Sequence, residues 1–183
     1  MNVQRCILFI TAIAVCVIAA SAWRRPPRYI WNLTASVPRG LYRLEPGAPI
    51  DVTSLVAAAP PEPLATALDL NGYLSCGVPL LKRVLALPGQ RVCRFGAVIT
   101  VDAVTLLMST AQARDARGRP LPSWHGCHRI ADDEVFLMNW DSNDSLDGRY
   151  FGVLPRAAVI GRAIPVWTEE AGDGRFVWSA PTQ

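Results

Sequence analysis

Short apolar runs separated by glycine and proline make up most of the chain after residue 28. The 183 residues include 13 glycines and 15 prolines, which interrupt helices and mark turns. Runs that are short, or that are themselves broken by these residues, favour strands over helices. We therefore predict a mainly β fold. The runs lie at 40–44, 72–87, 96–108, 133–140, 148–154 and 157–167.

Two stretches depart from this pattern. Residues 56–74 are rich in alanine and leucine, and Pro61 or Pro63 suits the first turn of a short helix. Residues 109–128 are polar and contain glycine and proline, which predicts a long loop or the tip of a ribbon. The tail after residue 168 is predicted to be a loosely held terminus.

The N-terminal residues 1–23 indicate export. A short basic start is followed by seventeen uncharged residues, 6–22. This length lies between the 7 to 15 residues of a signal-peptide core and the roughly 20 of a membrane-spanning helix. Ala20 and Ala22 also form the small-residue pattern that a signal peptidase cuts. Both interpretations export residues 24–183, and we favour an uncleaved anchor.

The charges that flank this segment point the other way. Arg24, Arg25 and Arg28 outnumber Arg5, which under the positive-inside rule would keep the downstream domain in the cytoplasm. We give more weight to the export-like start and to the chemistry below. The expected organisation is an anchor or signal segment at 1–23 and an exported domain at 24–183, with a ribbon or loop excursion at 93–130.

Charge and cysteine content narrow the function classes. The formal net charge is only +3 and the arginines are scattered, so no electrostatic footprint for nucleic acid is visible. Three cysteines lie downstream of the apolar segment, which allows one disulfide at most. A bond between Cys93 and Cys127 would join the ends of the excursion. The alternative is that Cys76, Cys93 and Cys127 are buried free thiols.

Lys82 is the only lysine among 18 lysine and arginine residues. Arginine cannot deprotonate in a protein, whereas a desolvated lysine can. The surrounding run, 78–87, is apolar enough to lower the lysine pKa toward the range of a general base. The simpler alternative is a strand lysine whose stem packs on apolar neighbours while its amine reaches water.

A general base requires a nucleophile, and residues 32–44 offer Ser36. It precedes Pro38 and Gly40, where the chain is expected to turn and expose a hydroxyl. If the segment is extended, Thr34 lies on the same side and its hydroxyl could reach the carbonyl oxygen that Ser36 attacks. The alternative is an ordinary turn rich in serine and threonine.

Together these segments resemble a known family. TASVPRGLY (34–42) and LLKRVLALPGQRV (80–92) are similar to the nucleophile and lysine boxes of type I signal peptidases, membrane-tethered serine proteases with a Ser-Lys dyad. NWDSNDSLDGRYFG (139–152) resembles their third box. VPRGLY, GRPLPSW and VFLMN are most similar to the conjugative-transfer (TraF-type) branch, which matures a plasmid-encoded pilin precursor.

The resemblance implies a signal-peptidase-like β-sheet or β-barrel domain and a role for each matching residue. Ser36 would be the nucleophile and Lys82 the base, with the Thr34 hydroxyl and the Ser36 backbone N–H as the oxyanion hole. Ser145 would orient the amine, and Asp147 and Arg149 would form a supporting ion pair. The sequence departs from the family where the third box begins, at 139–143, and at Gln90, which replaces an acidic residue.

The resemblance also implies partners and a location. The enzyme would act at the bacterial inner membrane with its catalytic domain facing the periplasm, in contact with the lipid bilayer and a precursor-protein substrate. The substrate would be a pilin-like or signal-peptide-bearing precursor, and some relatives cyclise theirs. No cofactor, metal or nucleic acid is implied.

Alternative chemistries remain open at this point. His125, Cys127 and His128 could suggest a metal site, although a polar turn explains them more simply because a fourth ligand is missing. A triad that uses one of these histidines with a serine is a second alternative. A third is a non-catalytic exported β-domain that scaffolds a conjugation or secretion apparatus.

Overall fold

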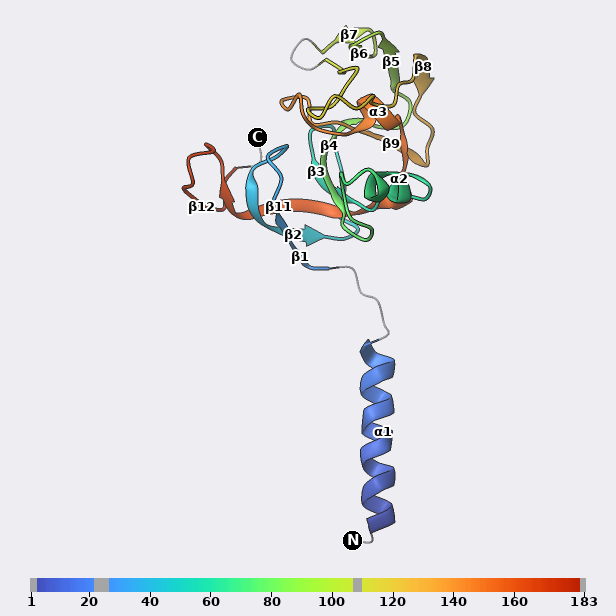
Figure 1. Cartoon of the computed structure of the whole chain (residues 1–183), viewed down its shortest axis with the longest axis vertical. Coiled ribbons are helices and arrows are strands. Elements are labelled where there is room, and N and C mark those ends of the chain that lie inside the picture. The colour runs from blue at the N-terminus through green and yellow to red at the C-terminus, as the bar shows by residue number, and fades with distance from the viewer. Residues whose placement is uncertain (1–2, 22–26, 107–109, 182–183) are drawn as a thin grey trace.

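The computed structural model describes residues 3–21, 27–106 and 110–181. It is mainly β, as predicted, with one N-terminal helix that stands apart from the sheets in Figure 1. The helices are α1 (Val3–Ser21), α2 (Leu64–Leu70), α3 (Gly148–Phe151) and the 3-10 turn η1 (Arg156–Ala158). The strands of the larger sheet are β1 (Tyr29–Asn32), β2 (Arg39–Glu45), β3 (Leu55–Ala58), β4 (Leu80–Ala86), β9 (Glu134–Leu137), β10 (Leu154–Pro155), β11 (Val159–Glu169) and β12 (Val177–Trp178).

The larger sheet is antiparallel and curls into a half-barrel. Its order is β1-β2-β11-β3-β4-β9-β10, and β12 pairs with β11 off this path. The long strand β11 pairs with β2 along one part and with β3 along another, with register shifts at 165–167 and 159–161. Such bulges bend a strand and increase its twist, which lets one strand belong to both halves of the curled sheet.

Strand β4 lies inside this sheet, between β3 and β9. All seven of its residues are buried, which agrees with its nearly continuous apolar sequence. Two charged residues, Lys82 and Arg83, are buried within it, at 5% and 8% exposure. The fold therefore removes the chain's single lysine from water.

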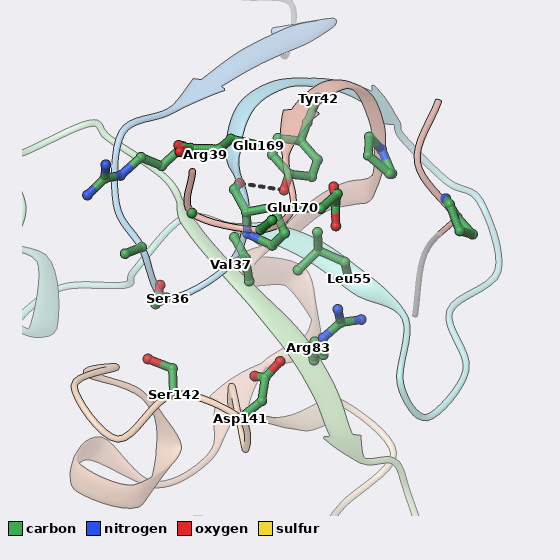
Figure 2. A pocket seen from close by; sticks show the side chains of 16 residues that line it. Ser36, Val37, Arg39, Tyr42, Leu55, Arg83, Asp141, Ser142, Glu169 and Glu170 are labelled. Atoms are coloured by element: carbon green, nitrogen blue, oxygen red, sulfur yellow. Dashed lines mark hydrogen bonds between the residues drawn. The ribbon is translucent and has the colours of Figure 1, made fainter. Parts of the chain in front are cut away.

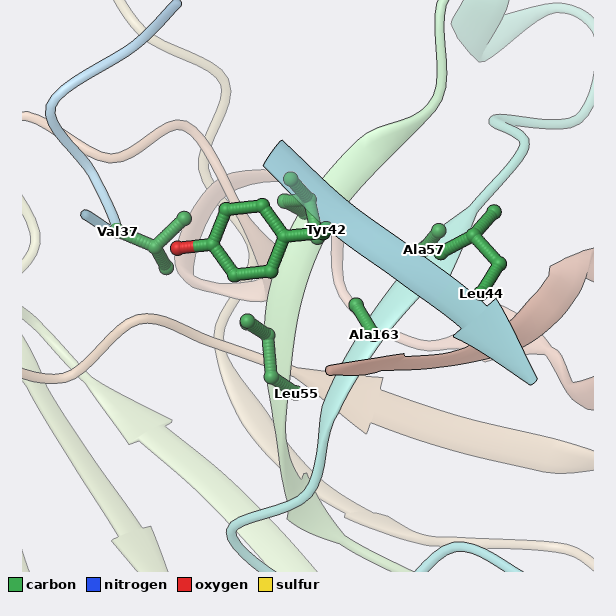
Figure 3. Packing of buried hydrophobic residues seen from close by; sticks show 7 residues of the cluster. Val37, Tyr42, Leu44, Leu55, Ala57 and Ala163 are labelled. Carbon is green, nitrogen blue, oxygen red and sulfur yellow. The ribbon is translucent and has the colours of Figure 1, made fainter. Parts of the chain in front are cut away.

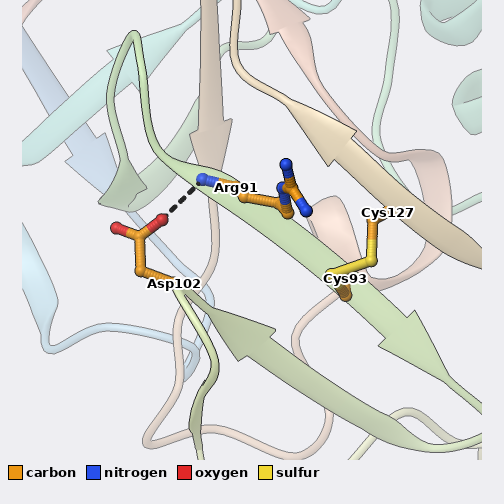
Figure 4. Close-up of a disulfide and its surroundings, with 4 residues drawn as sticks. All are labelled: Arg91, Cys93, Asp102 and Cys127. Atoms are coloured by element: carbon orange, nitrogen blue, oxygen red, sulfur yellow. Dashed lines mark hydrogen bonds between the residues drawn. A yellow bond between two sulfur atoms is a disulfide. The ribbon is translucent and has the colours of Figure 1, made fainter.

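A smaller sheet is built from the predicted excursion. Its order is β7-β6-β5-β8. The strands are β5 (Arg91–Phe95), β6 (Val98–Val101), β7 (Val104–Thr105) and β8 (Gly126–Arg129). The predicted disulfide between Cys93 and Cys127 is confirmed, and it joins paired positions of β5 and β8 (Figure 4). In the same view the Asp102 carboxylate accepts a hydrogen bond from the Arg91 backbone N–H at 2.8 Å.

Several local predictions can now be compared with the structure. The short helix within 56–74 is confirmed as α2, preceded by Pro63. The loop predicted at 109–128 contains an isolated bridge from Arg114 to Pro120, as a ribbon tip would, but β8 begins at Gly126. Residues 107–109, which include the start of this loop, lie outside the described residues.

Two predictions were wrong. Residues 148–154 were expected to form a strand, but helix α3 occupies the first four of them because the Asp147 side chain caps it by accepting the Arg149 backbone N–H. The C-terminal tail was expected to be loosely held. Instead β12 pairs with β11, and Trp178 stacks on Trp167 with ring centroids 5.7 Å apart.

The predicted segment 1–23 contains helix α1, which confirms a helix there. Among the residues with described placement, no helix is both long enough and apolar enough to cross a membrane. Ala22, Trp23, Arg24 and Arg25, on which the cleavage and orientation arguments depend, lie outside the described residues.

Candidate active site

Lys82 is fixed by the strand that carries it and by one buried amide. Strand β9 ends at Leu137, and the side chain of Asn139 continues its contact with β4. Asn139 accepts a hydrogen bond from the Arg83 N–H at 3.0 Å and donates one to the Leu81 carbonyl at 3.2 Å. These bonds hold the backbone on both sides of Lys82, so the direction of its side chain is set by a buried and fully bonded frame.

Ser36 lies in the turn between β1 and β2, and Asn32 organises that turn. The Asn32 side chain is buried, and its Nδ2 lies within 3.1 Å of three backbone carbonyl oxygens as donor. Its Oδ1 accepts from the backbone N–H and the hydroxyl of Thr34, at 3.1 and 2.9 Å. The acceptors of Nδ2 are the carbonyls of Thr34, Val37 and Pro38. One side chain thus bonds four backbone groups around a half-buried Ser36.

The far end of the turn is anchored in the core. Val37 packs with Tyr42, Leu55 and Ala163 in one cluster, shown in Figure 3. The Tyr42 hydroxyl donates to the Pro38 carbonyl at 2.6 Å. Burial, and secondly the charge of a nearby carboxylate, raises the pKa of Tyr42, so its phenol stays protonated and can donate.

Gly40 allows the turn to lie close to β11. Its φ is +137°, and a Cβ at this position would lie 2.1 Å from the Trp167 carbonyl oxygen. No other residue fits without moving the backbone. The glycine in the VPRGLY segment is therefore explained by the close approach of β2 to β11.

Ser145 is held by a fully buried ion pair. The side chains of Asp147 and Arg149 are both 0% exposed, and Arg149 meets the carboxylate through two nitrogens, at 2.9 and 2.8 Å. Its Nη2 also donates to the Ser142 and Ser145 carbonyls, at 2.6 and 3.1 Å. Asp147 in turn accepts the Asn139 backbone N–H at 3.1 Å. The loop that carries Ser145 is thereby tied to the frame that holds β4.

These three elements bring together the hydroxyls and the amine that the sequence singled out. Lys82 Nζ donates to Ser145 Oγ at 2.8 Å and lies 3.5 Å from Ser36 Oγ. The first distance is a well-formed hydrogen bond and the second is at the outer limit. The amine thus lies between a buried hydroxyl and a half-buried one.

The electrostatics of the amine follow from its burial. Desolvation lowers the pKa of Lys82 from 10.5 to about 8, because the charged form is disfavoured in a dry site. The negative charge of Asp147 acts against this shift, and the positive charge of Arg149 adds to it. Burial is the largest of the three influences and decides the direction of the shift.

Two clefts meet at Ser36. One, of about 600 Å³, is mostly apolar and includes Leu81, Lys82 and Ser145 in its lining. The other, of about 530 Å³, is shown in Figure 2 and is more polar. There Asp141 and Arg83 lie on one side and Glu170 on the other, while the guanidinium of Arg39 points away. An extended chain that crosses Ser36 could therefore occupy both.

Comparisons with known proteins identify the family. The sequence model of a protein family described as "Signal peptidase, peptidase S26" matches residues 2–168. The chain is 38% identical over 148 residues to a probable conjugal transfer protein TraF of Sinorhizobium fredii, which covers 76% of this chain and 77% of that one. It is 34% identical over 177 residues to the conjugal transfer protein TraF of Agrobacterium tumefaciens, covering 92% and 98%. The chain belongs to the peptidase S26 signal peptidase family.

More distant members of the S26 family also match. A probable signal peptidase I-1 of Synechocystis is 30% identical over 116 residues, covering 63% of this chain and 54% of that one. The crystal structure of a signal peptidase I from Enterococcus faecalis is 17% identical, with a TM-score of 0.39, and covers 64% of this chain and 98% of that one. The recognition made from the three sequence boxes is confirmed by the family match.

One premise about the candidate site was wrong. Thr34 was placed beside Ser36 on the assumption of an extended segment, but residues 34–37 form a turn. The Thr34 hydroxyl donates to Asn32 Oδ1 at 2.9 Å. A hydroxyl has one proton to donate, so its predicted oxyanion role requires that this bond be exchanged. The role stays a prediction.

The histidines lie outside the candidate site. His128 lies on β8 and contacts Glu134 at 2.6 Å, and neither it nor His125 is among the residues that line the two clefts. Cys127 is in the disulfide. Across residues 3–21, 27–106 and 110–181, no group of three histidine, cysteine or acidic side chains is arranged to hold a metal.

Sequence reasoning missed Asn32 and Asn139. Both are buried polar residues that bond the backbone around a proposed catalytic group, Ser36 in one case and Lys82 in the other. The available signal was an asparagine directly after an apolar run and before a turn, where side-chain amides often bond local backbone. Asn139 is the first residue of the third box, in the part of the box where this sequence departs from the family pattern.

Proposed function

We propose that the chain is a serine endopeptidase in which Ser36 is the nucleophile and Lys82 the general base. The observation that supports this most is the position of one dry amine between the hydroxyls of Ser36 and Ser145, at 3.5 and 2.8 Å. With a pKa of about 8, roughly a tenth of the amine is neutral at pH 7. An uncharged amine can donate to Ser145 and keep its lone pair for the Ser36 proton.

The proposed reaction has two halves. Lys82 Nζ takes the hydroxyl proton of Ser36 as its Oγ bonds to the carbonyl carbon of the substrate. The resulting ammonium gives that proton to the departing amine when the peptide C–N bond breaks, leaving an acyl-enzyme. Water, or an amine of the substrate, then attacks the ester carbonyl with Lys82 again as base, and Ser36 is released.

The Ser36 backbone N–H is proposed to stabilise the oxyanion, together with the Thr34 hydroxyl after it exchanges its bond to Asn32. Asp147 and Arg149 act through the backbone of the Ser145 loop, to which Arg149 donates at 3.1 Å. They are positioning residues. The carboxylate of Asp147 raises the pKa of Lys82, and the guanidinium of Arg149 opposes that effect, so the amine can stay uncharged.

The proposed location is the bacterial inner membrane, with residues 1–23 as a tether and the catalytic domain in the periplasm. The uncharged segment 6–22 supports the tether, and the S26 family supports action beside a membrane. From the end of α1 at Ser21 to Ser36, an extended chain covers at most about 50 Å. The nucleophile would therefore stay near the bilayer, where exported precursors are cut.

The proposed substrate is the precursor of a conjugative pilin. The relatives named conjugal transfer protein TraF support a role in conjugative transfer. The substrate would bind in extended form as an added strand across Ser36, with small apolar side chains in the cleft that contains Lys82.

The decisive experiment is coexpression of the chain with a conjugative pilin precursor. Lys82→Arg keeps a positive charge but cannot act as a base, so the precursor is expected to remain uncut, as with Ser36→Ala. Arg43→Lys, at an exposed ion pair with Glu45, is the matched control and leaves processing intact. Normal maturation with Lys82→Arg would favour the non-catalytic scaffold instead.

Two further measurements test the remaining parts. Replacing His125 and His128 together is expected to leave cleavage unchanged, and its loss in a folded protein would favour a histidine triad. The mass of the membrane-extracted protein is expected to include residues 1–22. A mature protein that lacks them would contradict the proposed tether.

A further inference from the structure

The connection between α2 and β4, residues 71–79, forms one wall of the apolar cleft, to which Tyr73, Leu74 and Val78 contribute. Its backbone hydrogen bonds are short-range. The N–H groups of residues 71–74 bond to carbonyls of residues 67–69, and the Val78 N–H bonds to the Ser75 carbonyl. A wall with local bonds alone is readily displaced, so its position depends on what holds it from outside.

Two side chains of the excursion, Asp115 and Arg119, supply that hold through Tyr73 and the Asn71 carbonyl. The Tyr73 hydroxyl donates to the Asp115 carboxylate at 2.7 Å. Arg119 donates to the same carboxylate through Nε at 2.7 Å, and its guanidinium lies 4.4 Å from the centre of the Tyr73 ring. Arg119 Nη1 also donates to the Asn71 carbonyl at 2.6 Å. We call Tyr73, Asp115 and Arg119 the latch.

The latch is built around one firmly held carboxylate. Asp115 also accepts the backbone N–H groups of Arg117 and Arg119, at 2.9 and 2.8 Å. These bonds, led by the one from Tyr73, hold the pKa of Asp115 far below its usual range. The side chain of Asp115 is 11% exposed. Its charge and its geometry are therefore fixed before any substrate arrives.

The same stretch of the excursion is bonded to the opposite wall. The Gln112 backbone N–H donates to the Tyr150 hydroxyl at 3.1 Å, and its side-chain amide reaches the Asn143 carbonyl at 3.5 Å. Asn143 lies two residues before Ser145, whose loop lines the apolar cleft with Leu146. Residues 110–121 thus connect both walls of the cleft, from outside it.

We propose that the latch residues are positioning residues that set the width of the apolar cleft, and with it the affinity for extended peptides with apolar side chains next to the cleavage site. The proposal rests on the proposed endopeptidase function. Asp115 and Arg119 do not line the apolar cleft, so their effect on binding passes through Tyr73 and the wall.

The test uses the full chain in detergent and two substitutions. Tyr73→Phe keeps the ring and removes the bond to Asp115, and Arg119→Gln removes the bond to Asn71 and the stacked cation. Arg114→Gln is the matched control, because Arg114 lies in the same stretch but donates to the Gly118 carbonyl instead of the wall. Hydrogen exchange of residues 71–79 reports on the wall. Cleavage of an internally quenched peptide with alanine–x–alanine before the scissile bond reports on binding.

The latch variants are expected to exchange faster over 71–79 and to raise KM about 3- to 10-fold with kcat within about twofold, as expected for one or two lost hydrogen bonds. The control is expected to leave all three quantities unchanged. Unchanged exchange in both latch variants, or a loss of kcat at unchanged KM, would overturn the proposal. The latter is what general destabilisation would produce.

Failure of the endopeptidase proposal would look different. If the wild-type chain and Ser36→Ala cleave the peptide equally, Ser36 is not the nucleophile, and the KM differences between latch variants lose their meaning. The exchange measurement needs no turnover, so it still shows whether the latch holds the wall.

Discussion

The two hydroxyls beside Lys82 are held in different ways. Ser36 lies half-buried in a turn that is organised by one neutral amide, Asn32. Ser145 is 2% exposed, on a loop that is fixed by the fully buried pair of Asp147 and Arg149. One hydroxyl faces the junction of two clefts, and the other is buried at the wall of the apolar cleft.

The difference reflects what each hydroxyl has to do in the proposed reaction. Ser36 must meet substrate and then water, so its surroundings have to stay open, and a turn bonded by one amide can adjust. Ser145 only has to hold an amine that must remain dry, and a buried charged pair that also bonds the surrounding backbone gives a rigid loop. Lys82 Nζ thus has an adjustable partner in Ser36, at 3.5 Å, and a rigid one in Ser145, at 2.8 Å.

The largest effect is expected when the amine of Lys82, which contacts both hydroxyls, is removed. Lys82→Met is expected to lower kcat by about 10²- to 10⁴-fold, the range for a lost general base. It is also expected to stabilise the fold at pH 7 by roughly 2–3 kcal/mol, since the pKa of Lys82 is lowered from 10.5 to about 8. Between these pKa values the unfolded chain binds a proton that the folded one does not. Wild-type stability therefore falls as the pH drops from 10.5 to 8 and levels off below 8, whereas the variant lacks this dependence.

Urea unfolding at pH 7 and at pH 10.5 measures this directly. The stability difference between Lys82→Met and wild type is expected to shrink at the higher pH. Ser36→Ala is the control, because it removes activity without removing the buried amine. If Lys82→Met is less stable than wild type at pH 7, the site is wetter than its 5% exposure indicates.

Breaking the rigid side should cost more stability than breaking any surface pair. Arg149→Met leaves the Asp147 carboxylate buried without its partner, and the free energy of unfolding is expected to fall by about 3–5 kcal/mol. Arg43→Met removes an arginine whose ion pair with Glu45 is half exposed, so it is expected to cost less than about 1 kcal/mol. Chemical denaturation of the two variants separates these values. Equal losses would mean that the buried pair does not hold the Ser145 loop.

The open side should respond more mildly. Asn32→Ala removes the donor to three carbonyls around Ser36, and the free energy of unfolding is expected to fall by about 1–3 kcal/mol. The fraction of kcat that is lost is expected to exceed the fraction of protein that is unfolded. Thr66→Ala, which removes an exposed bond to the Glu62 carboxylate, is the matched control. Denaturation and peptide cleavage at saturating substrate measure both effects. A variant with full kcat would show that the turn holds its shape without Asn32.

The sequence indicated the elements of the site better than their supports. Glycine and proline between apolar runs predicted a mainly β fold, and the lysine inside 78–87 predicted a buried amine, since both depend on local pattern. The cysteine count allowed one disulfide at most, and the expected excursion at 93–130 favoured the Cys93–Cys127 pair that the structure contains. The pairing of the C-terminal tail was missed: β12 is only two residues long, and Trp178 stacks on Trp167 of β11, eleven residues earlier in the chain.

Local overrides account for the other errors. The run 148–154 has the composition of a strand, yet a single cap from Asp147 turns its first four residues into α3. Thr34 was expected to point with Ser36, but Asn32 bends the chain into a turn and takes the Thr34 hydroxyl. In both cases a side-chain oxygen next to the segment decided the backbone, and strand periodicity does not register such bonds.

The smallest expected effect concerns the hydrogen bond between Lys82 Nζ and Ser145 Oγ. In wild type, kcat/KM is expected to rise about tenfold between pH 7 and pH 9, because the neutral amine forms with a pKa of about 8. Ser145→Ala removes the 2.8 Å partner of Lys82 Nζ and is expected to lower the high-pH plateau about 2- to 10-fold. The midpoint should remain near 8, because burial is the main cause of the low pKa and the variant leaves the amine buried. A pH–rate profile of each protein separates plateau from midpoint. If the midpoint moves toward 10.5 while the plateau is unchanged, Ser145 keeps the amine dry and does not orient it.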